Sequence, residues 1–183
     1  MQEREILSST HTILAAGDSL TYGFGAPAES SYPARLRQKV SMKVINAGEN
    51  GETSSEGLQR LPSLLNTYHP KLTILCYGGN DILQKRSMQQ LKENLKKMIA
   101  LCKEADSEIL LIAVPNMTLF GLEPLALYEE VSEETNTPLL SGVLSEILEE
   151  PSMKSDQVHP NAKGYQKLGD AVYKKLKALS LIP

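Results

Sequence analysis

Two segments of the sequence carry residues that could together activate a nucleophile. Near the start of the chain, Ser19 follows Gly17 and Asp18 at the end of an apolar run. Near its end, Asp156 and His159 are separated by two residues. A histidine can remove the proton of a serine hydroxyl, and a neighbouring carboxylate orients the imidazole and favours its protonated form. The pattern predicts a serine nucleophile with a histidine base, provided that the fold brings the two segments together.

The sequence contains three histidines, which narrows the choice of base. His11 and His69 each precede an apolar, strand-like run, so both are expected at the end of the sheet away from Ser19. His159 is therefore the histidine that we expect to reach Ser19. The alternative for Asp156 and His159 is a capped helix start with an incidental histidine.

Two further segments could supply hydrogen-bond donors to the same site. Residues 46–53 read Asn-Ala-Gly-Glu-Asn-Gly-Glu-Thr, and a glycine loop entering a helix can present a free N–H group to an anion. Residues 78–81 read Gly-Gly-Asn-Asp, where Asn80 could direct its side-chain amide into the same crevice. Each segment also has an ordinary explanation when taken alone. Ser19 is typical of a helix N-cap, the glycines of turns, and Asn80 of an Asx turn or a helix cap.

Short apolar runs alternate with longer amphipathic segments along the chain. Strands are predicted at 12–16, 43–46, 72–77 and 109–114, with a short fifth strand at 138–141. Helices are predicted at 31–40, 54–68, 87–104, 123–136 and 161–179, and residues 116–124 are predicted to be irregular. Apolar strands separated by helices indicate a parallel sheet covered on both faces, which is a flavodoxin-like, three-layer α/β/α sandwich of about five strands. Ligands of such sheets bind outside the carboxyl ends of the strands.

Composition sets limits on the class of protein. A chain of 183 residues predicts one domain over residues 1–183. A net charge of −3 gives no indication of binding to nucleic acid or to an anionic membrane. No apolar run is long enough for a membrane helix. The N-terminus lacks the pattern of a secretory signal, so a cytoplasmic location is expected, or a periplasmic or secreted one if a signal peptide has been removed. Cys76 and Cys102 are predicted to be buried thiols, without the spacing of a zinc site.

Taken jointly, the four segments resemble the four sequence blocks of the SGNH hydrolases, also called GDSL esterases or lipases. The blocks are Gly17-Asp18-Ser19-Leu20, Gly51-Glu52-Thr53, Gly78-Gly79-Asn80-Asp81 and Asp156-x-x-His159, and they occur in order over nearly the whole chain. The resemblance is closest to the branch of bacterial arylesterases and acyl-CoA thioesterases/lysophospholipases. The serine does not stand in the Gly-x-Ser-x-Gly turn of the α/β-hydrolases, because Thr21 occupies the place of the second glycine.

The resemblance implies a role for each matching residue. Ser19 would be the nucleophile, His159 the base and Asp156 the residue that orients it. The N–H groups of Ser19 and Gly51 and the side chain of Asn80 would form the oxyanion hole. Gly51 is preferred to Gly48 because Thr53 follows it by two positions, and the role of Gly48 is left open.

The resemblance also implies a carboxylic ester hydrolase that needs no cofactor and no metal. Its expected substrates are small esters or thioesters: aryl esters, short-to-medium acyl esters, lysophospholipids or acyl-CoA. Apolar residues in the segments after the third and fourth strands could form an acyl groove: Ile82, Leu83, Met117, Leu119, Phe120 and Leu122. The alternative is that these residues only cover the core. The alternatives are a carbohydrate or small-molecule O-acetyl deacetylase, an acyltransferase, and a non-catalytic α/β binding module. No nucleic-acid partner and no integral membrane association are expected, and the chain is predicted to be a monomer or a small homo-oligomer.

Overall fold

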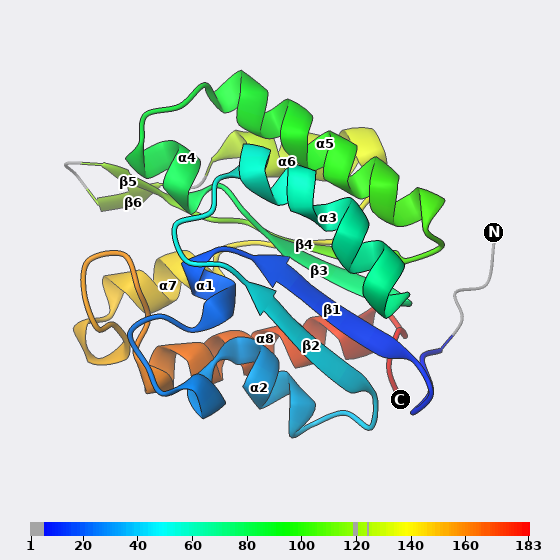
Figure 1. Cartoon of the computed structure of the whole chain (residues 1–183). Helices are drawn as coiled ribbons and strands as arrows, with labels where there is room; N and C mark the ends of the chain where they lie inside the picture. The colour runs from blue at the N-terminus through cyan, green and yellow to red at the C-terminus, as the bar shows by residue number, and fades with distance from the viewer. Residues whose placement is uncertain (1–5, 119–120, 124) are drawn as a thin grey trace.

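The computed structural model describes residues 6–118, 121–123 and 125–183. At its centre is a parallel sheet of five strands in the order β2-β1-β3-β4-β7 (Figure 1). The strands are β1 (Thr12–Gly17), β2 (Lys43–Gly48), β3 (Leu72–Cys76), β4 (Glu108–Ile112) and β7 (Leu139–Leu140). Every residue of β3 is buried, and so are all but the first of β1 and of β4. Continuous burial of this kind explains why these strands are apolar throughout rather than alternating.

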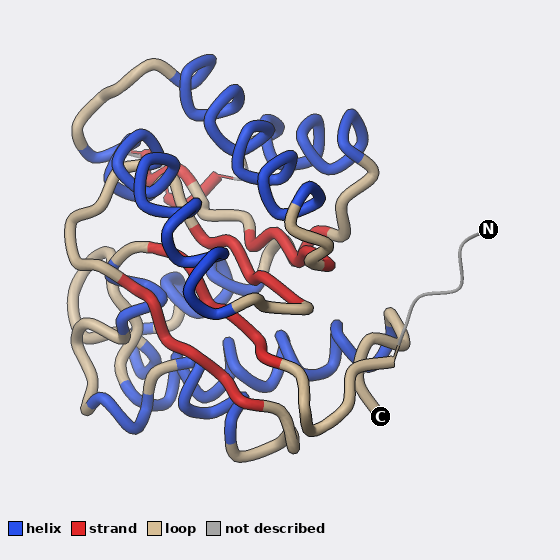
Figure 2. Tube along the Cα trace, turned by 45° about the vertical axis from the view of Figure 1, so that its right-hand side comes forward, coloured by secondary structure: helices blue, strands red, loops and turns tan. Residues whose placement is uncertain are grey.

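Helices cover both faces of the sheet, as Figures 1 and 2 show. One face carries α3 (Ser54–Tyr68), α5 (Met88–Glu104) and α6 (Ala126–Thr135). The other carries α2 (Tyr32–Arg37), α7 (Val143–Glu149) and α8 (Ala162–Ala178). The short elements are α1 (Ser19–Tyr22), α4 (Gly79–Leu83) and the 3-10 turns η1 (Ala28–Ser30) and η2 (Pro151–Met153). The predicted three-layer α/β/α sandwich is therefore confirmed.

The register of the sheet aligns the ends of its central strands. Gly17 at the end of β1 pairs with Gly48 at the end of β2 on one side and with Cys76 at the end of β3 on the other. The segments that follow these three residues therefore leave the sheet at one edge, next to each other. Figure 1 shows α1, α4 and the β5–β6 hairpin at this edge.

Two parts of the predicted secondary structure are corrected. Residues 116–124, predicted to be irregular, include an antiparallel hairpin of β5 (Asn116–Thr118) and β6 (Gly121–Glu123), and α6 begins at Ala126 rather than at 123. Strands of three residues are too short for an alternating pattern to distinguish them from a loop. Helix α7 was not predicted, because its seven residues are shorter than the window in which helical periodicity is reliable.

The chemical environment of the cysteines is as predicted. Both Cys76 and Cys102 are buried and free. Burial raises the pKa of the Cys102 thiol to about 12, so it stays protonated at neutral pH. No helix in the described part of the chain is long and apolar enough to cross a membrane.

Candidate active site

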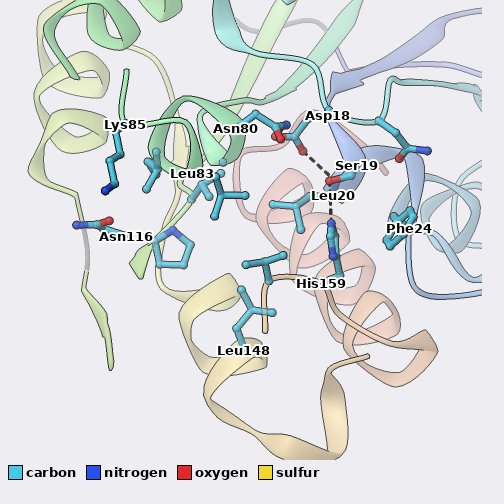
Figure 3. A pocket seen from close by; sticks show the side chains of 17 residues that line it. Asp18, Ser19, Leu20, Phe24, Asn80, Leu83, Lys85, Asn116, Leu148 and His159 are labelled. Carbon is cyan, nitrogen blue, oxygen red and sulfur yellow. Dashed lines mark hydrogen bonds between the residues drawn. The ribbon is translucent and has the colours of Figure 1, made fainter. Parts of the chain in front are cut away.

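Ser19, His159 and Asp156 form a chain of hydrogen bonds at the carboxyl edge of the sheet. The Oγ of Ser19 lies 3.0 Å from the Nε2 of His159 (Figure 3). The Nδ1 of His159 lies 2.8 Å from Oδ2 of Asp156 and 3.0 Å from its Oδ1. Ser19 is the first residue of α1 and His159 lies just before α8, 140 positions further along the chain. The structure therefore joins the two segments whose residue types suggested a nucleophile and a base.

A tight loop before α8 holds Asp156 and His159 together. Oδ1 of Asp156 accepts hydrogen bonds from the backbone N–H groups of Val158 and His159, each at 2.8 Å. Partial burial of the carboxyl opposes its ionisation, but these N–H groups and the His159 ring outweigh it and hold the pKa of Asp156 below its ordinary value. Asp156 is therefore a carboxylate at neutral pH, which favours a proton on the Nδ1 of His159.

The ring of His159 also packs against the ring of Phe24. The ring centroids are 4.6 Å apart, and the planes are tilted by 48°. The hydroxyl of Tyr165, on α8, donates a hydrogen bond to the carbonyl of Phe24 at 2.8 Å. The imidazole is thus held between a carboxylate and an aromatic ring, and its Nε2 faces Ser19.

Three potential donors meet beside Ser19. The backbone N–H groups of Ser19 and Gly51 make no hydrogen bond to another residue in the described part of the chain. Gly51 has a φ of 80°, which glycine adopts without strain, and no atom of another segment lies within 4 Å of where a Cβ would stand. Asn80, on α4, lines the same cavity as these two residues. Such a cluster can bind a developing negative charge on oxygen.

Gly48, whose role the sequence leaves open, lies elsewhere. Its N–H donates to the Oδ1 of Asn46 at 3.0 Å. A Cβ at this position would stand 2.1 Å from the backbone nitrogen of Tyr22, so glycine is needed here for β2 to pack against α1. The contacts of Gly48 are structural, whereas Gly51 borders the cavity.

The amide of Asn80 is fixed by two acceptors. Its Nδ2 donates to the carbonyl of Glu52 at 3.0 Å and lies 3.4 Å from the Oδ2 of Asp18. Asp18 is buried, and its Oδ1 accepts the N–H of Leu20 at 2.9 Å. Burial raises the pKa of Asp18 to about 7, against the effect of the Leu20 N–H group and with help from the charges of Asp81 and Glu52. A partly neutral Asp18 reduces the negative charge beside the donors.

Two hydrogen-bond clusters behind the site hold the donor segments in place. The carboxylate of Glu52 accepts from the Nε and Nη2 of Arg60 at 2.7 and 2.6 Å, and from the hydroxyl of Tyr77 at 3.0 Å. The carboxylate of Asp81 accepts from the backbone N–H and the hydroxyl of Ser54 at 2.8 and 2.6 Å. Since Glu52 follows Gly51 and Asp81 follows Asn80, each cluster anchors a residue adjacent to a donor.

The three donors open onto a cavity of about 590 Å³. Most of its wall away from the hydrogen-bonding groups is apolar, formed by Leu20, Phe24, Ile82, Leu83, Val114, Pro115, Leu148 and Val158. Of the residues predicted for an acyl groove, Ile82 and Leu83 line this cavity, and Leu122 is not in its wall. Leu119 and Phe120 lie outside the described residues, as does the side chain of Met117.

Several residues that line the cavity were not predicted from the sequence. Leu148 belongs to α7, whose buried Val143, Leu144 and Ile147 recur at helical spacing, but over a segment too short for that spacing to identify a helix. Phe24 and Val158 had no local signal, because each reaches the site through a loop whose path depends on tertiary packing. Lys85 and Asn116 were also missed, and both follow strand-end segments that the sequence had placed beside the crevice.

The fold and the site together define a class of protein. A serine in contact with a histidine–aspartate pair, beside an asparagine amide at the edge of a three-layer sheet, is the arrangement implied by the SGNH resemblance. The profile of the GDSL-like Lipase/Acylhydrolase family matches residues 15–167. The chain belongs to this family, and it is a carboxylic ester hydrolase.

Named relatives agree with this assignment. "Thioesterase 1/protease 1/lysophospholipase L1" of Escherichia coli K12 is 32% identical over 179 residues, covering 94% of this chain and 86% of the relative. "Arylesterase" of Vibrio mimicus is 28% identical, covering 92% and 89%. The crystal structure of TesA superposes with a TM-score of 0.85 at 28% identity, covering 92% of this chain and 99% of that one. The psychrotrophic esterase EstA from Pseudoalteromonas sp., inhibited by monoethylphosphonate, gives a TM-score of 0.83 at 26% identity, covering 92% and 98%.

Proposed function

We propose that this enzyme hydrolyses carboxylic esters and thioesters through an acyl-enzyme intermediate formed on Ser19. The observation that carries the proposal is the unbroken contact from the Oγ of Ser19 through the His159 ring to the Asp156 carboxylate. A histidine placed in this way can act as a general base toward the serine hydroxyl. The apolar cavity beside it has room for an acyl chain.

The reaction has two halves. In the first, His159 takes the Ser19 proton as Oγ attacks the substrate carbonyl, and then gives that proton to the leaving alcohol or thiol. In the second, His159 takes a proton from water as the water attacks the acyl-Ser19 ester, and then gives that proton back to the Oγ of Ser19 as the acid leaves. Asp156 stabilises the imidazolium formed in each half.

The tetrahedral oxyanion would be stabilised by the N–H groups of Ser19 and Gly51 and by the amide of Asn80. The long 3.4 Å contact from Asn80 to Asp18 is the weaker of its two contacts. We therefore propose that this contact yields first when the amide turns its hydrogen toward the oxyanion, while the bond to the Glu52 carbonyl keeps the side chain in place.

Asn80→Ala is expected to lower kcat by about 100- to 1000-fold, because one preorganised oxyanion donor is removed. KM should change much less, since the donor acts mainly in the transition state. Steady-state kinetics with p-nitrophenyl butyrate would measure both. Asn66→Ala, on the exposed side of α3, provides a matched control that should retain full activity. A decrease confined to KM would contradict the role proposed for Asn80.

The apolar cavity predicts a preference for acyl chains longer than acetyl. Each methylene that leaves water contributes about 0.8 kcal/mol, or up to about fourfold in kcat/KM. In a series of p-nitrophenyl esters from acetate to palmitate, we expect kcat/KM to rise by at least about tenfold from acetate to octanoate. The relatives named arylesterase and thioesterase/lysophospholipase support ester and thioester substrates for this chain. A sharp preference for acetate would instead favour an O-acetyl deacetylase.

A further inference from the structure

The apolar cavity is bounded at one end by a basic side chain. Helix α4 contains the oxyanion donor Asn80, and Lys85 lies two positions beyond its last residue, Leu83. Figure 3 shows the side chains of Lys85 and Asn116 at the same end of the pocket, on the far side of Leu83 from Ser19. A substrate arm running along the apolar wall from Ser19 would therefore end at Lys85.

The base of the Lys85 side chain is fixed by the way α4 ends. Lys85 has a φ of 54°, in the left-handed region that few residues other than glycine adopt. Its N–H donates to the carbonyl of Ile82 at 3.0 Å, and the N–H of Arg86 donates to the carbonyl of Asp81 at 2.8 Å. The backbone that directs Lys85 into the cavity is thus tied back to the helix that carries Asn80.

The ammonium group of Lys85 is available to a ligand. In the described part of the chain, no carboxylate lies within 4.0 Å of it, whereas Arg60, Lys92 and Lys96 each form an ion pair. Apart from Asp18, which is buried next to Ser19, no acidic residue is found in the described lining of this cavity. Lys85 is exposed, as is Leu83 beside it, so this cation stands at the open rim of the cavity, where an anionic group of a ligand can reach it.

The position of His159 indicates which arm of the substrate would reach Lys85. The leaving oxygen or sulfur must lie within hydrogen-bond reach of Nε2 of His159 to receive its proton. Lys85 and His159 are on opposite sides of Leu83 in the view of Figure 3. The leaving group therefore occupies the His159 side of the cavity, and the acyl arm extends along α4.

We propose that Lys85 and Asn116 form a subsite for a carboxylate at the far end of the acyl chain. The preferred substrates are then half-esters or half-thioesters of dicarboxylic acids. The carboxylate would accept hydrogen bonds from the ammonium of Lys85 and the side-chain amide of Asn116, and the methylenes would cover Ile82 and Leu83. This inference rests on the proposed hydrolysis at Ser19 and specifies its substrate class.

The test compares two esters that differ only at the distal end. Mono-p-nitrophenyl suberate carries a free carboxylate there, and its methyl-capped counterpart is neutral. We expect the ratio of their kcat/KM values to favour the free carboxylate in the wild type and to fall by about tenfold in Lys85→Gln, which removes a charge-assisted hydrogen bond. Arg86→Gln removes the neighbouring cation, which does not line the cavity, and should leave the ratio unchanged.

A ratio that is equal in the wild type and Lys85→Gln would overturn the subsite while leaving ester hydrolysis intact. An equal decrease of the kcat/KM ratio in Arg86→Gln would also overturn the subsite, because the preference would then come from the overall positive charge of this surface. If neither ester is hydrolysed, the proposed function fails, and calorimetry on the resting protein still tests the subsite. Suberate must then bind more tightly than octanoate, and Lys85→Gln must abolish that difference; equal affinities would refute the subsite.

Discussion

Ser19→Ala is expected to lower kcat/KM by about 10⁵- to 10⁶-fold, because the variant has no atom that can form the acyl-enzyme. The oxyanion donors and the cavity remain, so the small residual rate should come from attack by water. Within the described residues, the Oγ of Ser19 makes a hydrogen bond to His159 and none to the core, so its loss should leave the thermal unfolding temperature nearly unchanged. Hydrolysis of p-nitrophenyl butyrate, together with a thermal melt, measures both quantities.

Covalent labelling gives a second measurement on the same variant. A fluorophosphonate probe should modify the wild type at Ser19 and leave Ser19→Ala unmodified. Ser63→Ala, on the exposed face of α3, is a matched serine control that should label like the wild type. Equal labelling of the wild type and Ser19→Ala would show that another residue reacts. No labelling of the folded wild type would favour a non-catalytic binding module.

Asp156→Asn is expected to lower kcat by about 10³- to 10⁴-fold with the fold intact. The asparagine carbonyl can still accept the N–H groups of Val158 and His159, so the loop should keep its shape. Its amide would face the Nδ1 of His159, however, and would favour the tautomer that carries its proton on Nε2. That tautomer cannot accept the Ser19 proton, and the imidazolium would lose its carboxylate partner.

The side chain of Asp156 is 46% exposed, and that of His159 is 17% exposed, so water could partly replace the lost carboxylate. This exposure places the expected effect nearer the lower end of the range. Asp106→Asn, an exposed aspartate that pairs with Lys71, should have no effect on kcat. A loss smaller than tenfold in Asp156→Asn would mean that Asp156 only caps the loop and does not support the base.

The grouping of Ser19, Asn80 and His159 could be predicted because each lies within a few positions of the end of a strand or the start of a helix. Ser19 follows β1, Asn80 follows β3 and His159 precedes α8, and the ends of parallel strands must share one edge. The strand pattern alone therefore predicts that Ser19 and Asn80 lie at the same edge of the sheet. The pairing with His159 depended on the scarcity of histidine and on the resemblance to a family.

The walls of the cavity could not be predicted in the same way. Phe24 reaches His159 because Tyr165 on α8 holds its carbonyl, which is a contact between segments 141 positions apart. Leu148 lines the cavity because α7 packs against α8. Such positions depend on how helices and loops pack against one another, and a helical spacing such as that of the buried residues of α7 does not show where the helix packs.

The separation of 140 positions between Ser19 and His159 has a consequence during biosynthesis. At ribosomal rates of about 5–20 residues per second, the base emerges roughly 7–28 s after the nucleophile. Asn80 emerges partway through that interval, and until His159 follows, the growing polypeptide lacks the group proposed to remove the serine proton. With His159 as the proposed base, hydrolysis of esters can begin only after the segment that carries Asp156 and His159 has been synthesised and has docked beside Ser19.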